Sequence, residues 1–349
     1  MNFINRRRWR VVRNYCIGWT LAFAFLSIVR GVGTMELGEL KFDFVSSLLI
    51  SLTIGPIIGF ISGYSQVLME ERIYQRISIQ RFLVIRLLYS ILIVFALILI
   101  AYAVYQFYFG ADISLIAFAF DSGSFAIYFY VLFVDIFLDV LRQVNLMLGE
   151  GNLGKILRGK FYTPTEEERI FMFLDLQSST NLAERLGHIQ YSSLIQDCFN
   201  DLGVVVENEA EIYQYVGDEA VLTWKLNDGL RSQNCLKSFF NFKKQLISRS
   251  DYYQNKYGCK PFFKAGLHAG IVTVTEVGKY KKEIAFHGDP INTAARIQDQ
   301  CNRFNEELLM SEDLMNQIET DNYTFKAIGG IPLRGKEGEV SIYAVSQAL

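Results

Sequence analysis

Four long apolar runs near the start of the chain constrain its fold more than any other feature. They cover about residues 14–30, 44–66, 82–108 and 117–141. A helix needs roughly 20 mostly apolar residues to cross the hydrocarbon core of a bilayer, and each run approaches or exceeds that length. The chain has 349 residues, 51% of them hydrophobic, and nearly all of the apolar excess lies in these runs. We therefore expect residues 1–141 to form an all-α domain of four transmembrane helices.

The distribution of basic residues predicts how these helices are oriented. Lysine and arginine collect in the loops on the cytoplasmic side of a membrane. Here they lie before the first run, between the second and third, and after the fourth: Arg6, Arg7, Arg8, Arg10, Arg13, Arg72, Arg76, Arg81, Arg142, Lys155, Arg158 and Lys160. Apolar residues after arginines are also typical of a signal peptide, but no small-residue cleavage site follows, so the first run is interpreted as an anchor. The pattern predicts a multi-pass protein of the inner (plasma) membrane with both termini cytoplasmic.

Three acidic residues interrupt the fourth run. Acidic side chains at membrane depth are costly and often functional. One interpretation places Asp121 at the outer interface and Asp135 and Asp139 near the inner one. The alternative is that they sense a ligand or an ion.

The second half of the chain has the pattern of a soluble domain. Residues 142–168 contain several glycines and predict a linker or transducer, and short apolar runs alternate with helical patterns over residues 169–349. The net charge of -2 favours no particular partner, and the five cysteines form no CxxC pair, which argues against a zinc site or a disulfide framework. His268 and His287 are expected to be structural or solvated. The aromatic residues form no base-stacking stripe, so we expect no nucleic acid partner.

Two aspartates in this half stand where a strand and a hairpin end. Asp175 follows the buried run 170–174 and precedes a polar stretch that predicts a helix start near residue 181. Asp218 lies in a Gly-Asp turn between the strand patterns 211–216 and 219–224, which predict a hairpin. If the hairpin pairs beside the first strand, the two carboxylates converge. Such a pair suits Mg²⁺ bound with a polyphosphate, although a lone Gly-Asp turn is more often only a turn.

Several motifs together resemble the class III adenylate and guanylate cyclase family, in its membrane-anchored bacterial form. They are Phe173-Leu174-Asp175-Leu176-Gln177-Ser178-Ser179-Thr180, Tyr215-Val216-Gly217-Asp218-Glu219-Ala220-Val221-Leu222, Phe263-Lys264-Ala265-Gly266-Leu267-His268-Ala269-Gly270 and His287-Gly288-Asp289-Pro290-Ile291-Asn292-Thr293-Ala294-Ala295-Arg296-Ile297. Their order and spacing match the family over about residues 165–346. The resemblance implies an α+β ferredoxin-like catalytic domain that works as a homodimer.

The resemblance also implies a role for each residue of the site. Asp175 and Asp218 match the family's metal ligands, which hold two Mg²⁺ or Mn²⁺ ions in each active site. Asn292 and Arg296 match the pair that orients the ribose and stabilises negative charge on the phosphates, and they would come from the other subunit. Residues 176–180 (Leu176, Gln177, Ser178, Ser179 and Thr180) would cradle the terminal phosphates through backbone N–H groups. A basic residue that grips the triphosphate matches Arg334, with Lys336 as the second choice. The implied reaction converts ATP to cyclic AMP and pyrophosphate.

The resemblance is incomplete at the two positions that read the base. Adenylate cyclases of the family usually have a lysine three residues before the hairpin glycine, and an Asp or Thr seven residues before the helix asparagine. Guanylate cyclases usually have Glu and Cys there. This chain has Gln214 and Ala285. Glutamine can both donate and accept hydrogen bonds, and it could pair with adenine or guanine. ATP is favoured because it is the commoner substrate, GTP comes next, and a pyrimidine triphosphate stays open.

Two other classes of protein compete with this interpretation. One is a degenerate cyclase that binds nucleotide without turnover, as a sensor or partner subunit; the intact residues Asp175, Asp218, Asn292 and Arg296 argue against it. The other is a diguanylate cyclase or a sensor kinase. The chain lacks the Gly-Gly-Asp/Glu-Glu-Phe turn of the first, and a phosphoacceptor histidine on a dimerisation helix, typical of the second, is not seen.

Overall fold

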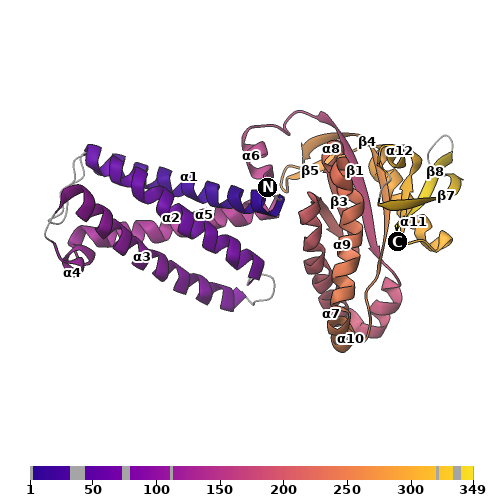
Figure 1. Ribbon diagram of the computed structural model, residues 1–349, viewed down its shortest axis with the longest axis horizontal. Coiled ribbons are helices and arrows are strands. Elements are labelled where there is room, and N and C mark those ends of the chain that lie inside the picture. The colour runs from indigo at the N-terminus through magenta and orange to yellow at the C-terminus, as the bar shows by residue number, and fades with distance from the viewer. Residues whose placement is uncertain are drawn as a thin grey trace. The chain divides into compact units, whose positions relative to one another are not determined.

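The computed structural model describes residues 3–31, 44–72, 79–110, 113–319, 322–332 and 339–348. The chain divides into two compact units, Met1–Val144 and Asn145–Leu349. In Figure 1 the first unit runs from indigo to magenta and the second from magenta to yellow.

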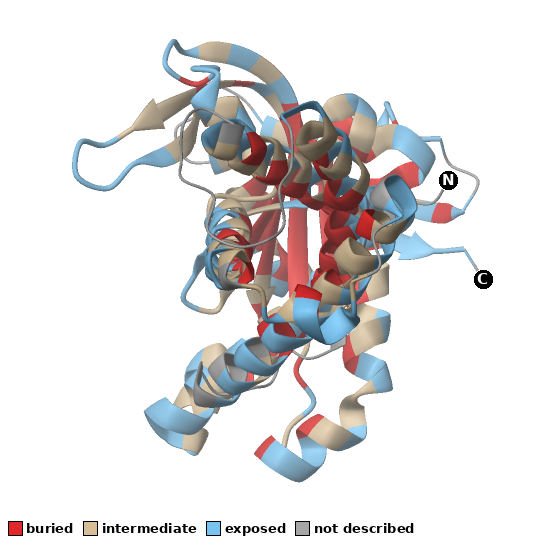
Figure 2. Ribbon diagram, turned by 90° about the vertical axis from the view of Figure 1, so that its left-hand side faces the viewer, coloured by how far each residue is buried: buried red, intermediate tan, exposed pale blue. Residues whose placement is uncertain are grey.

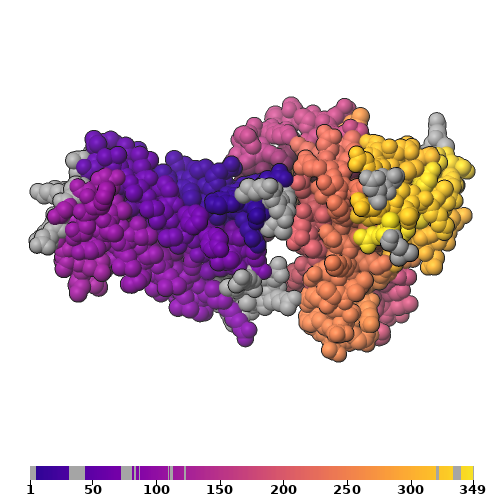
Figure 3. Space-filling model, in the orientation of Figure 1, coloured from indigo at the N-terminus to yellow at the C-terminus, as the bar shows by residue number. Residues whose placement is uncertain are grey.

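The described part of the first unit is helical. Its long helices are α1 (Phe3–Gly31), α2 (Phe44–Arg72), α3 (Ile79–Phe109) and α5 (Ser122–Met147), and a short helix α4 (Leu115–Ala119) precedes α5. Each long helix contains a stretch that is long and apolar enough to cross a membrane: Asn5–Arg30, Phe44–Glu71, Leu87–Tyr108 and Gly123–Met147. This confirms the prediction of four long apolar helices. The long helices lie side by side (Figure 1), and their atoms form one packed body in the space-filling view (Figure 3). Large apolar side chains such as Leu92 and Phe129 stay mostly exposed on the outer faces of these helices.

Ion pairs mark one end of this bundle. Arg8, near the start of α1, pairs with Glu71 at the end of α2, with 2.7 Å between Nε and Oε1. Arg142, near the end of α5, pairs with Glu70 at 2.7 Å. The start of α1 and the ends of α2 and α5 therefore lie at the same end of the bundle.

The fourth apolar helix begins later than predicted, and its aspartates lie in different surroundings. The backbone N–H of Gly123 donates to Asp121 at 3.0 Å, so this aspartate caps the start of α5. Asp135 is the central residue of the apolar stretch Gly123–Met147 and is fully buried. It accepts hydrogen bonds from the hydroxyls of Ser90 and Ser62, at 3.2 and 3.4 Å. Asp135 therefore lies among the packed helices, and its depth in a membrane stays a prediction.

A stripe of glycines brings α1 and α2 into backbone contact. Gly55, Gly59 and Gly63 recur every fourth residue, so they share one face of α2. A Cβ atom at any of them would come within 3.0 Å of the α1 backbone, at Thr20, Cys16 and Val12 respectively. Small residues at this spacing let helices in a membrane approach closely.

We expect Gly59→Leu to destabilise the first unit, because the added side chain meets the backbone of α1 and cannot be absorbed by a rotamer change. Overpacking of this kind costs about 1–3 kcal/mol, and more where backbone must move. Thermal unfolding of the detergent-solubilised protein and its elution in size-exclusion chromatography measure the effect. Ile57→Leu, on the same helix at a position that is 40% exposed, is the matched control. Wild-type stability in Gly59→Leu would contradict the close packing.

The second unit is an eight-stranded sheet with helices on both faces (Figure 1). The strand order is β2-β3-β1-β4-β6-β8-β7, with β5 paired to β4. The strands are β1 (Thr165–Leu176), β2 (Glu211–Val216), β3 (Glu219–Lys225), β4 (Phe263–Val277), β5 (Glu283–His287), β6 (Leu308–Ser311), β7 (Tyr323–Pro332) and β8 (Glu339–Gln347). The helices are α6 (Asn152–Leu157), α7 (Ser179–Leu202), α8 (Leu226–Leu230), α9 (Asn234–Ser248), α10 (Ser250–Tyr257), α11 (Asp289–Phe304) and α12 (Glu312–Met315), with 3₁₀ turns at Gly203–Asn208 and Arg231–Gln233.

Alternation along β1 divides the core of this unit between the two faces of the sheet. Successive side chains of a strand point to opposite faces. Ile170, Met172 and Leu174 lie in the cluster that includes residues of α7 and α9. Phe171 and Phe173 lie in the cluster that includes Ala294 of α11. Buried residues accordingly concentrate on the central strands (Figure 2).

Part of the predicted linker belongs to the folded second unit. α5 continues to Met147, and β1 begins at Thr165, five residues before the predicted strand, and pairs with β4 from there on. Phe161 is only 4% exposed, and its carbonyl accepts a hydrogen bond from the Glu276 N–H at 2.9 Å. The segment that enters the second unit is thus fastened to the sheet.

Candidate active site

Strand register brings the two predicted metal-binding aspartates together at the end of β1. Asp175 pairs with Glu219, the first residue of β3. Asp218 immediately precedes Glu219, in a turn where Gly217 has φ +63°, a conformation that favours glycine. The predicted convergence of Asp175 and Asp218 is therefore present in the fold.

Four carboxylates crowd this end of the sheet. Burial first, and then the nearby charge of Asp218, raise the pKa of Asp175 to about 6, although a hydrogen bond from Gln298 acts in the opposite direction. Burial first, and then the charges of Asp175, Asp299 and Asp218, raise the pKa of Glu219 to about 7. Burial also raises the pKa of Asp299, while Arg296 acts in the opposite direction. Desolvation and mutual repulsion both favour the protonated acids, so the cluster is suited to a cation.

The donor set fits Mg²⁺ or Mn²⁺ bound together with phosphate oxygens. Among the residues that the structure describes, no group of three or more His, Cys, Asp or Glu is arranged to hold a metal ion without other ligands. Mg²⁺ is typically held by one or two carboxylates and completes its shell with water and substrate phosphates. Asp175 and Asp218 match that requirement, and their oxygens are the ligands that these hard cations prefer.

The start of α7 offers backbone donors beside these carboxylates. α7 begins at Ser179, close to the predicted start near residue 181, and bends at Gly187, where the backbone is not helical. Ser178 has φ +59° at its N-cap, and its first turn contains no acidic residue. The first N–H groups of a helix have no partner inside it, and together with the helix dipole they attract anions. Leu176 is buried, so it can contribute only its backbone, whereas Gln177, Ser178 and Thr180 are exposed and Ser179 is half-buried.

Asn292 and Arg296 lie one turn apart on α11. Asn292 is exposed and Arg296 is half-buried, while Thr293, Ala294 and Ile297 between and beside them are buried. α11 lies close to β4, because a Cβ atom at Gly266 would collide with the backbone of Gln298. One chain therefore presents Asn292 outward instead of covering it.

The two base-reading positions lie on different faces of the sheet. Gln214 follows a β-bulge in β2 and pairs with Val221, which belongs to the cluster on the α11 face. Ala285 of β5 pairs with Thr275, while its neighbour Phe286 pairs with Val274 in that same cluster. Alternation then points Ala285 to the opposite face. A single chain does not bring the two positions to one face.

For three other residues considered in the sequence analysis, the structure gives little information about a role in the site. Arg334 and Lys336 lie outside the described residues. His268 is buried, with Nδ1 2.7 Å from the hydroxyl of Ser311, which agrees with a structural role.

Three residues near the carboxylates were not singled out from the sequence. Glu219 and Asp299 surround Asp175, and Tyr191 of α7 lies near Asp218 and Ser179, where burial first and then the Asp218 charge raise its pKa to about 12. The sequence could have indicated Glu219 as a residue of the site, because it directly follows Asp218. Asp299 and Tyr191 reach the site only through the packing of α11 and α7, which local sequence does not encode.

The carboxylate cluster predicts a pH-dependent effect of divalent cations on stability. An ordinary Asp or Glu loses its proton near pH 4, whereas Asp175 and Glu219 do so near pH 6 and 7 in the folded protein. Between these values the folded state binds more protons than the unfolded chain, so the free energy of unfolding falls as the pH rises and stays low above about pH 7. A bound cation offsets the repulsion. MgCl₂ should therefore raise the Tm by a few degrees at pH 8 and by less at pH 5.

Intrinsic tryptophan fluorescence during heating measures this shift, with KCl at equal ionic strength as the control. Without divalent cations, Glu219→Gln should melt above the wild type at pH 8 and close to it at pH 5. A magnesium-induced shift of equal size at both pH values would contradict the assignment.

Comparison with known proteins agrees with this geometry. The family model described as "Adenylate and Guanylate cyclase catalytic domain" matches residues 161–347. The chain is 34% identical over 180 residues to adenylate cyclase 2 of Rhizobium meliloti (strain 1021), covering 51% of this chain and 49% of that protein. It is 20% identical over 185 residues to an adenylate cyclase of Anabaena cylindrica, covering 50% of this chain and 36% of that protein. The chain thus spans about half or less of the length of these curated relatives.

A solved structure supports the fold. The structure of a bacterial light-regulated adenylyl cyclase superposes with a TM-score of 0.53 at 17% identity, covering 61% of this chain and 62% of that one. At this identity the likeness concerns the fold alone. Because the family model covers more than half of the chain and nearly all of its second unit, the chain belongs to the adenylate and guanylate cyclase catalytic domain family.

Proposed function

We propose that this protein is a membrane-anchored adenylate cyclase that converts ATP to cyclic AMP and pyrophosphate as a homodimer. The observation that carries the proposal is the convergence of Asp175 and Asp218 beside the start of α7, within the region that matches the cyclase family. Carboxylates for a cation and free N–H groups for phosphate stand at the same edge of one sheet, which suits a nucleoside triphosphate.

In the proposed reaction the ribose 3′-oxygen attacks the α-phosphorus. A bond forms between these atoms, the bond from the α-phosphorus to the oxygen shared with the β-phosphorus breaks, and pyrophosphate leaves. The 3′-hydroxyl loses its proton. Two Mg²⁺ or Mn²⁺ ions held by Asp175 and Asp218 would neutralise the triphosphate and make the 3′-oxygen a better nucleophile.

The protein's own groups bind and orient the nucleotide. N–H groups of residues 178–180 hold the terminal phosphates, since the Gln177 N–H already donates to the carbonyl of Phe262 at 2.9 Å. Arg334 or Lys336 adds a positive charge there. Arg296 stabilises the charge that develops on the phosphate oxygens, since its planar guanidinium pairs well with them. Asn292 orients the ribose.

A dimer would complete the site. Asn292 and Arg296 face outward on α11, and the exposed end of β2 beside Asp218 carries two large apolar side chains, Tyr215 (48% exposed) and Val216 (53%). Apolar surface next to a polar site is typical of a surface that a partner covers. We assign Asp175 and Asp218 to one subunit and Asn292 and Arg296 to the other, so that a homodimer has two equivalent sites. The same association offers a way to bring Gln214 and Ala285 of different chains to one base.

The four apolar helices would anchor the cyclase in the inner membrane. The end of the bundle marked by the pairs Arg8–Glu71 and Arg142–Glu70 carries basic residues, which favours a cytoplasmic position for that end. Both termini and the catalytic domain are then cytoplasmic, where ATP is made.

The first test compares nucleotides and a metal-site variant. Purified protein with Mg²⁺ or Mn²⁺ is given ATP, GTP, CTP or UTP, and the cyclic product is identified by mass spectrometry. We expect cyclic AMP to form fastest, and Asp218→Ala to lose nearly all turnover, because metal-assisted steps contribute several kcal/mol. Asp251→Ala, at an exposed position of α10, is the matched control and should keep wild-type turnover. Full activity of Asp218→Ala would refute the site, whereas a preference for another triphosphate would refute only the adenylate assignment.

The second test asks whether two chains share each site. Asp175→Ala and Arg296→Ala should each be inactive alone. When the two chains are co-expressed with different affinity tags in equal amounts, half of the dimers are mixed and each mixed dimer has one intact site, so activity should return to about a quarter of the wild-type value. Co-expression of Asp175→Ala with Asp218→Ala is the control. Each chain of that mixed dimer lacks one of its own two metal-binding aspartates, so neither site is intact and no activity should return. Inactive mixed dimers, isolated through both tags, would place the whole site in one chain.

A further inference from the structure

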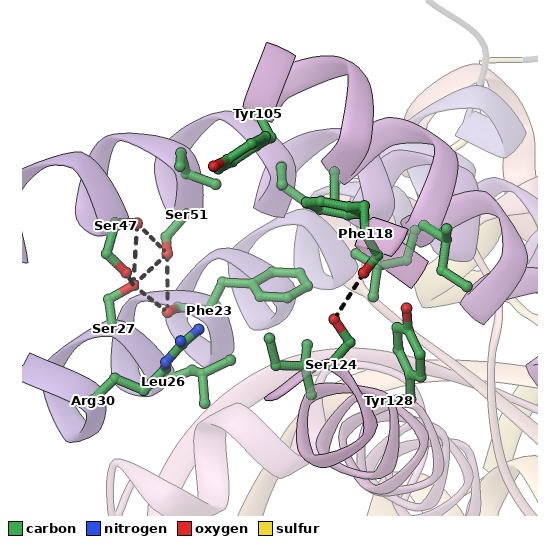
Figure 4. A pocket seen from close by; sticks show the side chains of 16 residues that line it. Phe23, Leu26, Ser27, Arg30, Ser47, Ser51, Tyr105, Phe118, Ser124 and Tyr128 are labelled. Atoms are coloured by element: carbon green, nitrogen blue, oxygen red, sulfur yellow. Dashed lines mark hydrogen bonds between the residues drawn. The ribbon is translucent and has the colours of Figure 1, made fainter. Parts of the chain in front are cut away.

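The polar groups around the pocket of the helical bundle bond to other groups of the bundle (Figure 4). The hydroxyl oxygens of Ser27 and Ser51 lie 2.6 Å apart, and Ser47 donates to Ser27 at 3.0 Å. The hydroxyl of Ser124 donates to the carbonyl of Phe118 at 3.1 Å. The partners of these hydroxyls take no part in the proposed chemistry. A buried glutamine of the second unit differs from them, because its side chain bonds to a metal ligand.

This glutamine, Gln298, is buried between α11 and the sheet. It is only 5% exposed. Its backbone lies against β4, since a Cβ atom at Gly266 would collide with it. Gly266 in turn pairs with Phe173 of β1, two residues before Asp175. The close packing of α11 on β4 therefore places Gln298 beside the end of β1.

The side chain of Gln298 forms a hydrogen bond with Asp175. An ionised carboxylate can only accept hydrogen bonds, so the amide N–H of Gln298 is the donor. The bond acts to lower the pKa of Asp175, as expected of a donor that favours the charged form. The backbone of Leu176 provides a second hydrogen bond to the same carboxylate. Groups of α11 and β1 thus hold the carboxylate together, and its remaining lone pairs are left for a cation.

An amide suits this position because it donates a hydrogen bond without adding a charge. Asp218, Glu219 and Asp299 already crowd the same end of the sheet with Asp175. A further acid in place of Gln298 would add to their repulsion, and a lysine or arginine would pair with Asp175 and compete with the cation. A neutral donor orients the carboxylate and does neither.

We propose that Gln298 is a positioning residue, whose amide holds the carboxylate of Asp175 in the orientation that receives the cation. The proposal rests on the proposed function, because it assigns a role at the same metal site. Groups that hydrogen-bond to a metal ligand fix its orientation, and their removal typically weakens metal affinity or activity by about 10–100-fold.

The two sides of α11 would then serve different active sites of the proposed homodimer. An α-helix has about 3.6 residues per turn, so residues two apart lie on nearly opposite sides of it. Gln298 faces its own sheet, whereas Asn292 is exposed and Arg296 is half-buried, and both are assigned to the partner's nucleotide. A change at Gln298 should therefore affect the site that contains Asp175 of the same chain.

The first test measures Mn²⁺ binding directly, without nucleotide or turnover. The full-length protein in detergent is titrated with MnCl₂ at pH 8, and free Mn²⁺ is followed by electron paramagnetic resonance. Binding at the site is the part that Asp218→Ala removes. Gln298→Met, which keeps the size of the side chain and removes the donor, should weaken this binding about tenfold. Gln298→Leu is the second variant without a donor, and the result is taken from whichever of them elutes as a monodisperse protein.

Gln233→Met is the matched control for the loss of a buried amide. Gln233 is 7% exposed, and its Nε2 donates to the carbonyl of Glu319 at 2.6 Å. This variant is expected to have a lower Tm and an Mn²⁺ affinity within twofold of the wild type. Wild-type affinity in Gln298→Met would overturn the proposal. An equal loss in Gln233→Met would also overturn it, as would the absence of any binding that depends on Asp218.

The second test uses the mixed dimer of Asp175→Ala and Arg296→Ala chains, whose one intact site takes Asp175 from one chain and Arg296 from the other. Gln298→Met is added to either chain, and turnover of ATP is measured against the Mn²⁺ concentration. The concentration for half-maximal turnover should rise about tenfold when the change lies in the chain that keeps Asp175. It should stay within twofold when the change lies in the chain that keeps Arg296.

The reverse pattern would show that Gln298 acts on the packing of α11 and not on Asp175, which would overturn the proposal. The two tests also separate this proposal from the proposed function. Mn²⁺ binding that depends on Gln298 in a protein without turnover would support the positioning role and refute the cyclase. Normal turnover with unchanged metal dependence in Gln298→Met would refute only the positioning role.

Discussion

The register of β1 with its two neighbours is the constraint on which the catalytic half of this protein depends. Pairing with β3 sets Asp175 opposite Glu219, and so beside Asp218 at the hairpin turn. Pairing with β4 on the other side sets Asp175 opposite Lys264. α11 packs closely on β4 at Gly266, so this pairing also fixes the position of α11 relative to Asp175. A slip by one residue would turn every side chain of β1 to the other face. The carboxylate of Asp175 would then enter the apolar layer that packs on α7 and α9, and it would be separated from water and from the other acids of the cluster.

Arg169 and the carboxylate cluster, both in the second unit, show opposite treatments of charge that is shielded from water. In the second unit, Arg169 is 2% exposed and is fully used: it pairs with Glu167 and Glu211 and donates to Thr223. In the active site, by contrast, acids gather next to acids, and their pKa values are raised as a result. In a structural ion pair the charges are neutralised by groups of the same chain. The negative charge of this cluster, by contrast, would be neutralised only by a bound cation. That difference is what marks the end of β1 as a functional site.

Sequence alone predicted the elements whose signal is local. Length and hydropathy were enough for the four apolar helices, and a buried apolar run and a Gly-Asp turn were enough for β1 and the β2–β3 hairpin. β6, α12 and β7 were not foreseen, because β6 is a short run whose place depends on parallel pairing with β4, far along the chain. The same reason applies to the site: Asp175 and Asp218 stand in motifs, whereas Asp299 reaches them only through helix packing. The burial of Asp135 also needed the fold, since a hydropathy pattern does not say which face of a helix meets its neighbours.

The glycine stripe on α2 has a consequence for how this chain can vary over evolutionary time. Positions on the outer faces of the helices, such as Leu92 or Phe129, can accept any large apolar residue, because no other part of the described bundle covers them. Residues 55, 59 and 63 have no such freedom, since a backbone lies where the first carbon of a side chain would stand. Sequence change in the first unit is therefore uneven. Its exposed positions can change almost completely, whereas the three positions on α2 must stay glycine. A related protein could then have the same helical bundle at low sequence identity, and the three glycines would be the positions at which the relationship could still be detected.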